Sequence, residues 1–193
     1  MGWVDQVPRA GKLYIGGLHA LYQKPDLFQQ AGITHIVSVL DFDIYEAGHF
    51  SNYKHIHIRQ DDDPNENLLQ QFKQSNAFIE DALGSGGGVF VHCAMGKSRS
   101  VTIVCAYLMG KFNLTPLQAL EQVCEGRPVC SPNPGFMEQL DIYGQILKAE
   151  DEDEADQIYR KWLDERYIGD PWTWEARKTA LEREVKNNRP SKL

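Results

Sequence analysis

The chain has 193 residues, of which 42% are hydrophobic and 24% charged, a composition typical of a globular protein rather than a disordered one. Its formal net charge of −7 argues against a protein that grips nucleic acid over its whole surface. The cysteines form no CxxC pair, which argues against a zinc site and against a secreted disulfide scaffold; they are Cys93, Cys105, Cys124 and Cys130. We therefore expect a reducing compartment, the cytoplasm or the nucleus.

The ends of the chain carry few targeting signals. No apolar run approaches the roughly 18 residues that a membrane-spanning helix needs. The last three residues, Ser191, Lys192 and Leu193, spell a peroxisomal address. We expect this tripeptide to be internal to a longer protein, and not to act as an address.

Residues 1–148 are predicted to form one α/β domain. Apolar and β-branched runs predict strands at 12–15, 34–40, 53–58 and 89–91. Apolar spacing and start signals at Thr115-Pro116 and Asn133-Pro134 predict helices over 67–83, 98–111, 115–125 and 133–148. Strands that alternate with helices predict a central, mostly parallel sheet with helices on both sides.

Residues 149–193 differ in composition and are predicted to form a helical extension. Acidic side chains crowd residues 150–156, which is typical of a solvated linker or of a helix N-terminus. After them, one predicted helical face carries apolar side chains, namely Ile158, Tyr159, Trp162, Leu163 and Tyr167. An apolar face needs cover, so we expect the extension to pack on the domain, with a partner protein as the alternative.

The residues from 89 to 101 carry the clearest chemical signal. A short apolar strand leads into the sequence HCAMGKSRS and then into a predicted helix. The loop from Cys93 to Arg99, the cysteine loop, can curl into a cradle whose N–H groups and following helix bind phosphate. The expected phosphate-binding residues are Ala94, Met95, Gly96, Lys97, Ser98 and Arg99. Arg99 would hold two phosphate oxygens, and the same donors favour the nucleophilic thiolate of Cys93.

An acid is also needed, because a thiolate that attacks a phosphate ester displaces an oxygen that must be protonated. Asp61, Asp62 and Asp63 follow the strand at 53–58 and precede the helix at 67–83. Their position alone does not choose among them. The alternative is a plain acidic turn before a helix.

Several neighbours of the loop have predicted supporting roles. Ser100 can donate to the sulfur, start the helix, or do both. His92 is interpreted as a buried structural histidine and not as a base. Cys105 and Cys124 are expected to be inert thiols on helices. A further hypothesis is that Cys130 approaches Cys93 and protects it as a disulfide.

The cysteine loop, together with Arg127-Pro128 and the stretch from Pro132 to Phe136, resembles the dual-specificity protein phosphatases, in the cysteine-dependent protein tyrosine phosphatase superfamily. The resemblance covers roughly residues 10–148. It implies a central sheet flanked by helices. It also implies a shallow cleft open to phosphotyrosine, phosphoserine and phosphothreonine, and no cofactor or metal.

The same resemblance implies roles for individual residues. Cys93 matches the nucleophile and Arg99 the phosphate clamp. Asp62 aligns best with the general acid, because residues 68–72 match the family's next helix. Asn133 matches an asparagine that supports the cysteine loop. Arg127 matches a second anion-binding arginine, with pairing to a nearby acid as the alternative.

Within this family the chain most resembles a eukaryotic subgroup whose members append a zinc-binding domain and are implicated in maturation of the large ribosomal subunit. The likeness rests on HCAMGKSRSVT, on residues 134–140 and on residues 159–162. The zinc domain is absent from this chain, so the chain is either truncated before that domain or departs from the subgroup, and we expect truncation. The expected partners are a phosphoprotein substrate and a pre-ribosomal particle, without direct contact to nucleic acid or membrane.

Two other functions compete with a protein phosphatase. Lys97 places a cation inside the cysteine loop, which favours phosphoinositides or inositol phosphates as substrates. The aromatic extension and the subgroup resemblance favour an interaction module in ribosome maturation that does not need catalysis.

Overall fold

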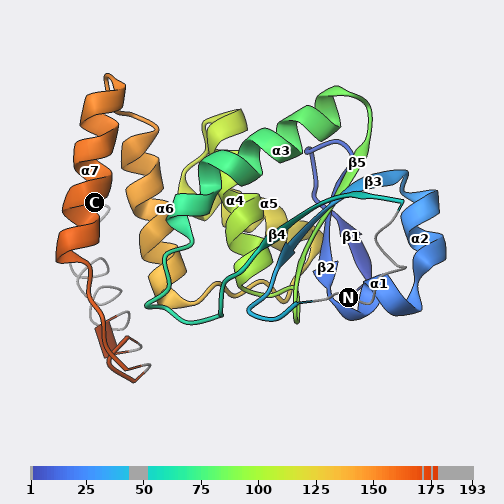
Figure 1. Cartoon of the computed structure of the whole chain (residues 1–193), viewed down its shortest axis with the longest axis horizontal. Coiled ribbons are helices and arrows are strands. Elements are labelled where there is room, and N and C mark those ends of the chain that lie inside the picture. Colours follow the sequence, from blue (N-terminus) through green and yellow to red (C-terminus); the bar gives the residue numbers. More distant parts are fainter. Residues whose placement is uncertain (1, 44–51, 171, 175, 178–193) are drawn as a thin grey trace, which may run out of the picture.

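The computed structural model describes residues 2–43, 52–170, 172–174 and 176–177 (Figure 1). Its strands form one sheet in the order β1-β2-β5-β3-β4. Their bounds are Val4–Gln6 (β1), Leu13–Gly17 (β2), Ile33–Val39 (β3), Lys54–Ile58 (β4) and Gly88–Cys93 (β5). β1 is antiparallel to β2 and the other pairs are parallel. The predicted mostly parallel sheet is confirmed.

Helices cover both faces of the sheet, as predicted (Figure 1). On one face lie α1 (His19–Gln23) and α2 (Pro25–Gln30). On the other lie the short 3-10 turn η1 (Leu69–Gln71) and the helices α3 (Phe72–Gly84), α4 (Arg99–Phe112), α5 (Pro116–Gly126) and α6 (Pro134–Ile146). Each face has its own apolar cluster, and the larger one lies beneath α3 to α6.

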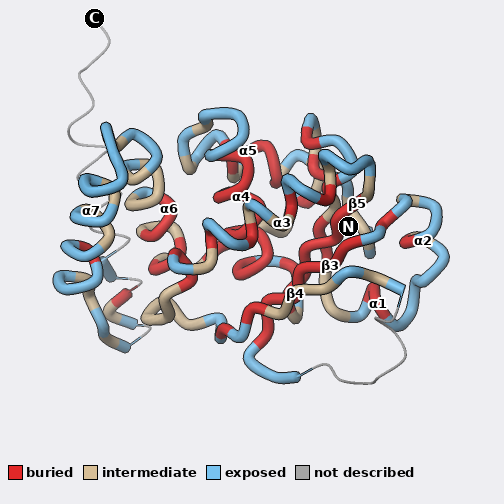
Figure 2. The backbone as a smooth tube through the Cα atoms, turned by 45° about the horizontal axis from the view of Figure 1, so that its top comes forward, coloured by how far each residue is buried: buried red, intermediate tan, exposed pale blue. Residues whose placement is uncertain are grey.

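The central strand β5 shows why its sequence is continuously apolar. Val89 and Val91 face the larger cluster, while Phe90 faces the smaller one and packs edge-on against Phe28 with ring centroids 4.8 Å apart. Successive strand residues point to opposite faces, and both faces of a parallel sheet are covered. Figure 2 shows the resulting buried segments along β3, β5 and α4.

The element boundaries differ from prediction in a few places. The expected helix over 67–83 starts as the 3-10 turn η1 and becomes α-helical only at Phe72. Both predicted caps are present, because Thr115 accepts a hydrogen bond from the Gln118 N–H and Asn133 accepts one from the Phe136 N–H. The strand β1 and the helices α1 and α2 were not predicted. They are three to six residues long, too short to show a periodic pattern.

The extension contains α7 (Glu152–Glu165), which packs along α6 (Figure 1). The acidic run is the start of this helix, since the Asp151 side chain caps it by accepting from the Glu154 N–H at 2.8 Å. Trp162 is only 7% exposed and joins the larger core cluster. The predicted apolar face is wrong in two members: Leu163 is 40% exposed, and Tyr167 lies beyond the end of the helix.

Two predictions concern the chain as a whole. The division into residues 1–148 and 149–193 stays a prediction, and the tripeptide at 191–193 lies outside the described residues. Within the described part of the chain, no helix is long and apolar enough to cross a membrane.

Candidate active site

The cysteine loop joins the central strand to the helix that covers it. Cys93 is the last residue of β5 and Arg99 is the first of α4. Both lie among buried residues, and the Cys93 side chain is almost inaccessible. Because β5 runs parallel to both of its neighbours, the loop lies at the carboxyl edge of the sheet, where open α/β proteins bind ligands.

The backbone of the cysteine loop is turned so that its carbonyl groups face the protein. The carbonyl of Ala94 accepts from the Leu18 N–H, that of Lys97 accepts from the Ser131 N–H, and those of Met95 and Gly96 accept from one arginine. In a planar trans peptide the N–H points away from the C=O. The next N–H groups, of residues 95–98, therefore face the opposite side, where they form an anion-binding cradle.

That arginine is Arg127, which is 2% exposed. Its guanidinium donates to Met95 O at 3.0 Å and to Gly96 O at 2.6 Å, and it forms an ion pair with Asp5 at 2.6 Å. The donors of Arg127 are thus directed to the protein itself. This corresponds to the alternative of pairing with a nearby acid, and the anion-binding role implied by the resemblance stays a prediction.

Gly96 cannot be another residue without disturbing the cradle. Its φ of +68° lies in the left-handed region, and a Cβ there would be 2.2 Å from Gly16 O and 2.9 Å from the Arg127 side chain. The close approach of β2 and Arg127 gives the physical reason for a glycine at this position.

The Cys93 sulfur lies against donors of the loop and the helix start. The Gly96 N–H donates to Sγ at 3.2 Å, and the Ser100 hydroxyl lies 3.3 Å from it. Hydrogen bonds and the positive end of a helix both stabilise a thiolate relative to a thiol. The residues expected to act on the sulfur are therefore brought together.

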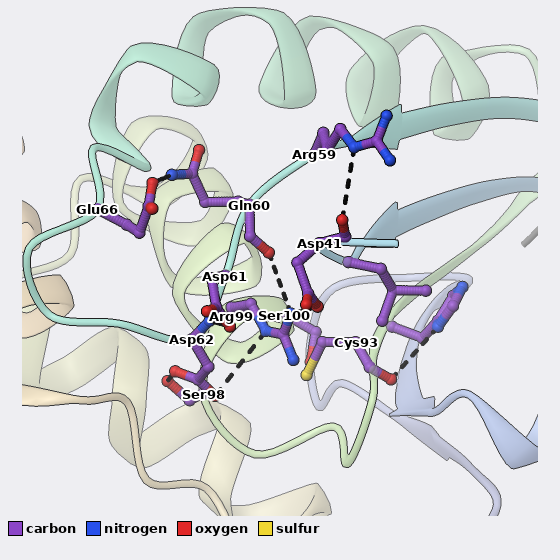
Figure 3. Close-up of polar contacts among 12 residues, drawn as sticks. Asp41, Arg59, Gln60, Asp61, Asp62, Glu66, Cys93, Ser98, Arg99 and Ser100 are labelled. Atoms are coloured by element: carbon purple, nitrogen blue, oxygen red, sulfur yellow. Dashed lines mark hydrogen bonds and ion pairs between the residues drawn. The ribbon is translucent and has the colours of Figure 1, made fainter. Parts of the chain in front are cut away.

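Arg99 is held by two groups that the sequence analysis missed (Figure 3). Its Nη1 donates to Gln60 O at 3.0 Å and to Asp41 Oδ1 at 3.2 Å. Its Nε is buried and has no hydrogen-bond partner among the described residues. The guanidinium is thus fixed through Nη1. Its Nε has an ion-pair contact of 3.9 Å to Asp62 but no hydrogen bond to the described residues, so it can donate to an anion. Asp41 lies two residues beyond the end of β3 and directly after the predicted strand 34–40, and this position was the signal that the sequence offered for it.

Of the three consecutive aspartates, Asp62 reaches the cysteine loop. Its Oδ1 accepts from the Ser98 hydroxyl at 2.6 Å and from Asn133 Nδ2 at 3.0 Å, and its Oδ2 lies 3.9 Å from Arg99 Nε. The carboxylates of Asp61 and Asp63 instead accept from backbone N–H groups of their own turn. Asp62 remains 35% exposed, so it can reach a substrate.

Asn133 links the same two segments. Its backbone N–H donates to Ser98 Oγ at 3.1 Å, while its side chain both donates to Asp62 and caps α6. The asparagine expected to support the cysteine loop thus contacts that loop through Ser98 and also holds the aspartate.

His92 lies fully buried behind the loop. Its Nε2 is 2.6 Å from the Ser38 hydroxyl, its ring stacks on Phe90, and its Nδ1 lies 3.4 Å from Cys93 O. Burial, the main cause, lowers the pKa of His92 to about 3, so the ring stays neutral near neutral pH. The burial and the contacts of His92 agree with the structural role predicted for it.

No hydrogen bond among the described residues joins the sulfur of Cys93 to one of the other three cysteines. Burial raises the pKa of Cys105 well above its ordinary value. Burial and the neighbouring Cys124 raise the pKa of Cys130 to about 12, and its thiol donates to Arg127 O at 2.9 Å. The structure thus places Cys130 beside Cys124, and a disulfide between Cys130 and Cys93 stays an untested hypothesis.

The rim of the loop is open, with Lys97 exposed and Met95 61% exposed. Within residues 2–43, 52–170, 172–174 and 176–177, no group of three or more His, Cys, Asp or Glu side chains could hold a metal ion.

Comparison with known proteins identifies this arrangement. The family model for the dual specificity phosphatase catalytic domain matches residues 13–146. Dual specificity protein phosphatase 1 of Arabidopsis thaliana is 39% identical over 140 residues, which cover 72% of this chain and 69% of the plant protein. Dual specificity protein phosphatase 22-B of Danio rerio is 37% identical over 162 residues, covering 83% of this chain and 81% of the fish protein.

A solved structure agrees with both. The Yvh1 phosphatase domain of Chaetomium thermophilum superposes with a TM-score of 0.67 and 34% identity, covering 77% of this chain and 99% of that domain. The predicted resemblance is confirmed, and a Yvh1 domain is among the similar structures. The chain belongs to the dual-specificity phosphatase family and is a cysteine-dependent protein phosphatase of that family.

Proposed function

We propose that this enzyme hydrolyses phosphotyrosine, phosphoserine and phosphothreonine monoesters through a phosphocysteine intermediate. The observation that carries the proposal is the position of the Cys93 sulfur. It lies at the base of the N–H cradle. The same site holds the buried Nε of Arg99, which makes no hydrogen bond to the described residues. A phosphate held in that cradle would have its phosphorus in front of the sulfur.

In the first step the Cys93 thiolate attacks phosphorus and the bond to the ester oxygen breaks. The N–H groups of the cysteine loop and Arg99 stabilise the charge on the other phosphate oxygens. Asp62, protonated at that moment, gives its proton to the leaving oxygen. This role is supported by the hydrogen bonds that hold Asp62 against the loop.

In the second step water attacks the phosphocysteine, and Asp62, now ionised, accepts the water's proton. The sulfur leaves as a thiolate, and inorganic phosphate is released. The Ser100 hydroxyl, 3.3 Å from the sulfur, stabilises that thiolate by donating a hydrogen bond. Ser100 therefore acts mainly in this step.

The test is phosphate release by the wild type and by Cys93→Ser on matched phosphotyrosine, phosphothreonine and phosphoinositide substrates. We expect activity on the phosphopeptides that disappears in Cys93→Ser, and a phosphorylated protein that forms in the wild type alone. Activity that survives in Cys93→Ser would rule out the covalent route. A preference for the lipid that Lys97→Ala abolishes would instead favour phosphoinositides as the substrate class.

We also propose a role in ribosome assembly, in the cytoplasm or the nucleus, with a pre-ribosomal particle as partner. It is supported by the subgroup resemblance and by the likeness to a Yvh1 phosphatase domain. The test is complementation of a strain that lacks the gene, with ribosomal subunits measured by sedimentation. Rescue by Cys93→Ser would indicate an interaction module that does not need catalysis. Normal subunits in the deletion strain would contradict the role altogether.

A further inference from the structure

One asparagine near the proposed acid contacts the part of the extension that follows α7. Asn65 lies in the turn formed by residues 61–66, the acidic turn, three positions after Asp62. Its Nδ2 donates to Gly169 O at 2.9 Å, and its Oδ1 accepts from the Gly169 N–H at 2.9 Å and from Trp174 Nε1 at 3.0 Å. One side chain thus holds two points of the extension.

The backbone of Asn65 makes a further contact to the extension. Arg166 Nη1 donates to Asn65 O at 3.0 Å. The guanidinium of Arg166 also lies over the ring of Trp162, 5.5 Å from its centroid, and Trp162 belongs to the main core. The contact therefore connects the acidic turn to a rigid part of the protein.

The residues of the extension that contact Asn65 are well packed. Trp174 is 4% exposed and meets Tyr167 edge-on, with ring centroids 5.1 Å apart. Gly169 has no room for a side chain, because a Cβ there would lie 1.9 Å from the Tyr167 hydroxyl oxygen. Residues 166–174 thus present a fixed surface to Asn65, as far as they are described.

The acidic turn is short, so a constraint on Asn65 constrains Asp62. The Asn65 N–H donates to Asp63 Oδ1 at 2.7 Å, and the Glu66 N–H donates to Asp63 O at 3.1 Å. On its other side the turn is held by Asp62 itself, through Ser98 and Asn133. The turn is therefore held by the cysteine loop at Asp62 and by the extension at Asn65. Helix α6 holds its end, because Glu66 O accepts from Gln139 Nε2 at 2.8 Å.

We infer that Asn65 is a positioning residue for the general acid, and that the three residues of the extension that contact it, Arg166, Gly169 and Trp174, act on catalysis through it. This inference rests on the proposed role of Asp62. The extension lies beyond residue 146, where the match to the family's catalytic domain ends, so this contact is an addition to that domain. A misplacement of about 1 Å at a reacting group costs as much as about 100-fold in rate.

The test uses leaving groups that differ in their need for a proton. Phenyl phosphate releases a phenol with a pKa of about 10, so its cleavage depends on an acid, whereas a dinitrophenyl phosphate releases an anion that needs no proton. The quantity to measure is kcat/KM, because it reports the step in which the leaving group departs. The variants are Asn65→Ala and Trp174→Phe, with Trp172→Ala as control because Trp172 is 85% exposed.

We expect Asn65→Ala to lower kcat/KM for phenyl phosphate about tenfold and to leave the dinitrophenyl ester within about twofold. Trp174→Phe keeps an aromatic ring and removes one hydrogen bond. Its kcat/KM for phenyl phosphate should therefore fall by less, again with little change for the dinitrophenyl ester. Trp172→Ala should change neither value. Since Asn65 and Trp174 share one hydrogen bond, their double variant should lose less than the product of the single losses.

Equal losses on both esters, or no loss on either, would overturn the inference. Asn65→Ala removes several hydrogen bonds from a turn, so the melting temperature of this variant is measured as well. If Asn65→Ala does not fold, Trp174→Phe tests the inference. Asp62→Asn separates this inference from the proposed function. If Asp62→Asn does not lower kcat/KM more for phenyl phosphate than for the dinitrophenyl ester, the assignment of Asp62 as the acid fails. If Asp62→Asn shows this larger loss on phenyl phosphate but the Asn65 and Trp174 variants do not, the positioning role of Asn65 fails.

Discussion

The hydroxyl of Ser98 donates a 2.6 Å hydrogen bond to Oδ1 of Asp62, a residue 36 positions earlier in the chain. The same hydroxyl oxygen accepts the backbone N–H of Asn133 at 3.1 Å. One serine of the cysteine loop thus sets the distance between the phosphate cradle and the proposed acid.

Replacing Ser98 should therefore weaken the acid without removing the cradle. Ser98→Ala keeps the backbone N–H and loses one hydrogen bond worth about 1 kcal/mol. We expect kcat/KM for phenyl phosphate to fall about fivefold, with a smaller effect on a dinitrophenyl ester. Ser85→Ala, at the end of α3, is the matched control. An equal fall on both esters would show that Ser98 supports the cradle and not the acid.

Arg99 should not tolerate lysine. The guanidinium donates to Gln60 O and Asp41 through Nη1, and its Nε makes no hydrogen bond to the described residues. An ammonium group is a compact point charge that cannot bridge these positions. We expect Arg99→Lys to reduce kcat/KM at least about 100-fold and to weaken inhibition by vanadate. Near-normal turnover in Arg99→Lys would mean that the planar fork is not needed.

The buried ion pair of Arg127 and Asp5 should be important for stability as well as for the loop. Removing one partner of a buried pair leaves an uncompensated charge, which costs about 3–5 kcal/mol. We expect Asp5→Ala to lower the free energy of unfolding by about this amount, measured by denaturant titration. Arg9→Ala breaks an exposed ion pair to Glu125 and should leave the free energy of unfolding nearly unchanged. Equal effects of the two variants would contradict the special role of burial.

His92 predicts a specific pH dependence of folding. Its folded pKa of about 3 lies below the ordinary value of 6.5, so the unfolded chain binds a proton that the folded protein excludes. The contribution to stability is fully present above pH 6.5 and is lost as pH falls from 6.5 toward about 3. Within that window one proton corresponds to about 1.4 kcal/mol per pH unit.

The check is His92→Phe, which keeps a flat ring beside Phe90 and cannot titrate. Its free energy of unfolding should fall less steeply with decreasing pH in this window than that of the wild type, by roughly one proton. His19→Phe is the control, because His19 is exposed at the start of α1. Parallel pH curves for wild type and His92→Phe would show that His92 does not carry this dependence.

Features that depend on neighbouring residues could be predicted from the sequence. Cys93 and Arg99 belong to one strand–loop–helix unit, so their spacing was enough to place both at one cradle. The caps at Thr115 and Asn133 are equally local, because each side chain bonds an N–H three residues on. The apolar run at 89–91 likewise predicted a strand, and the structure shows that this strand, β5, is buried on both faces.

Other features arise only when distant segments meet. The pairing of Arg99 with Asp41 spans 58 residues, that of Arg127 with Asp5 spans 122, and that of Asn65 with Gly169 spans 104. The sequence narrowed the acid to three adjacent aspartates by position and pointed to Asp62 by resemblance. The contact with Ser98 distinguishes Asp62 structurally, because side-chain direction in a turn is set by what packs against it. The sequence by itself thus determined the chemistry of the cysteine loop, through local spacing, whereas the tertiary structure decided which charges hold that loop and what fixes the acid.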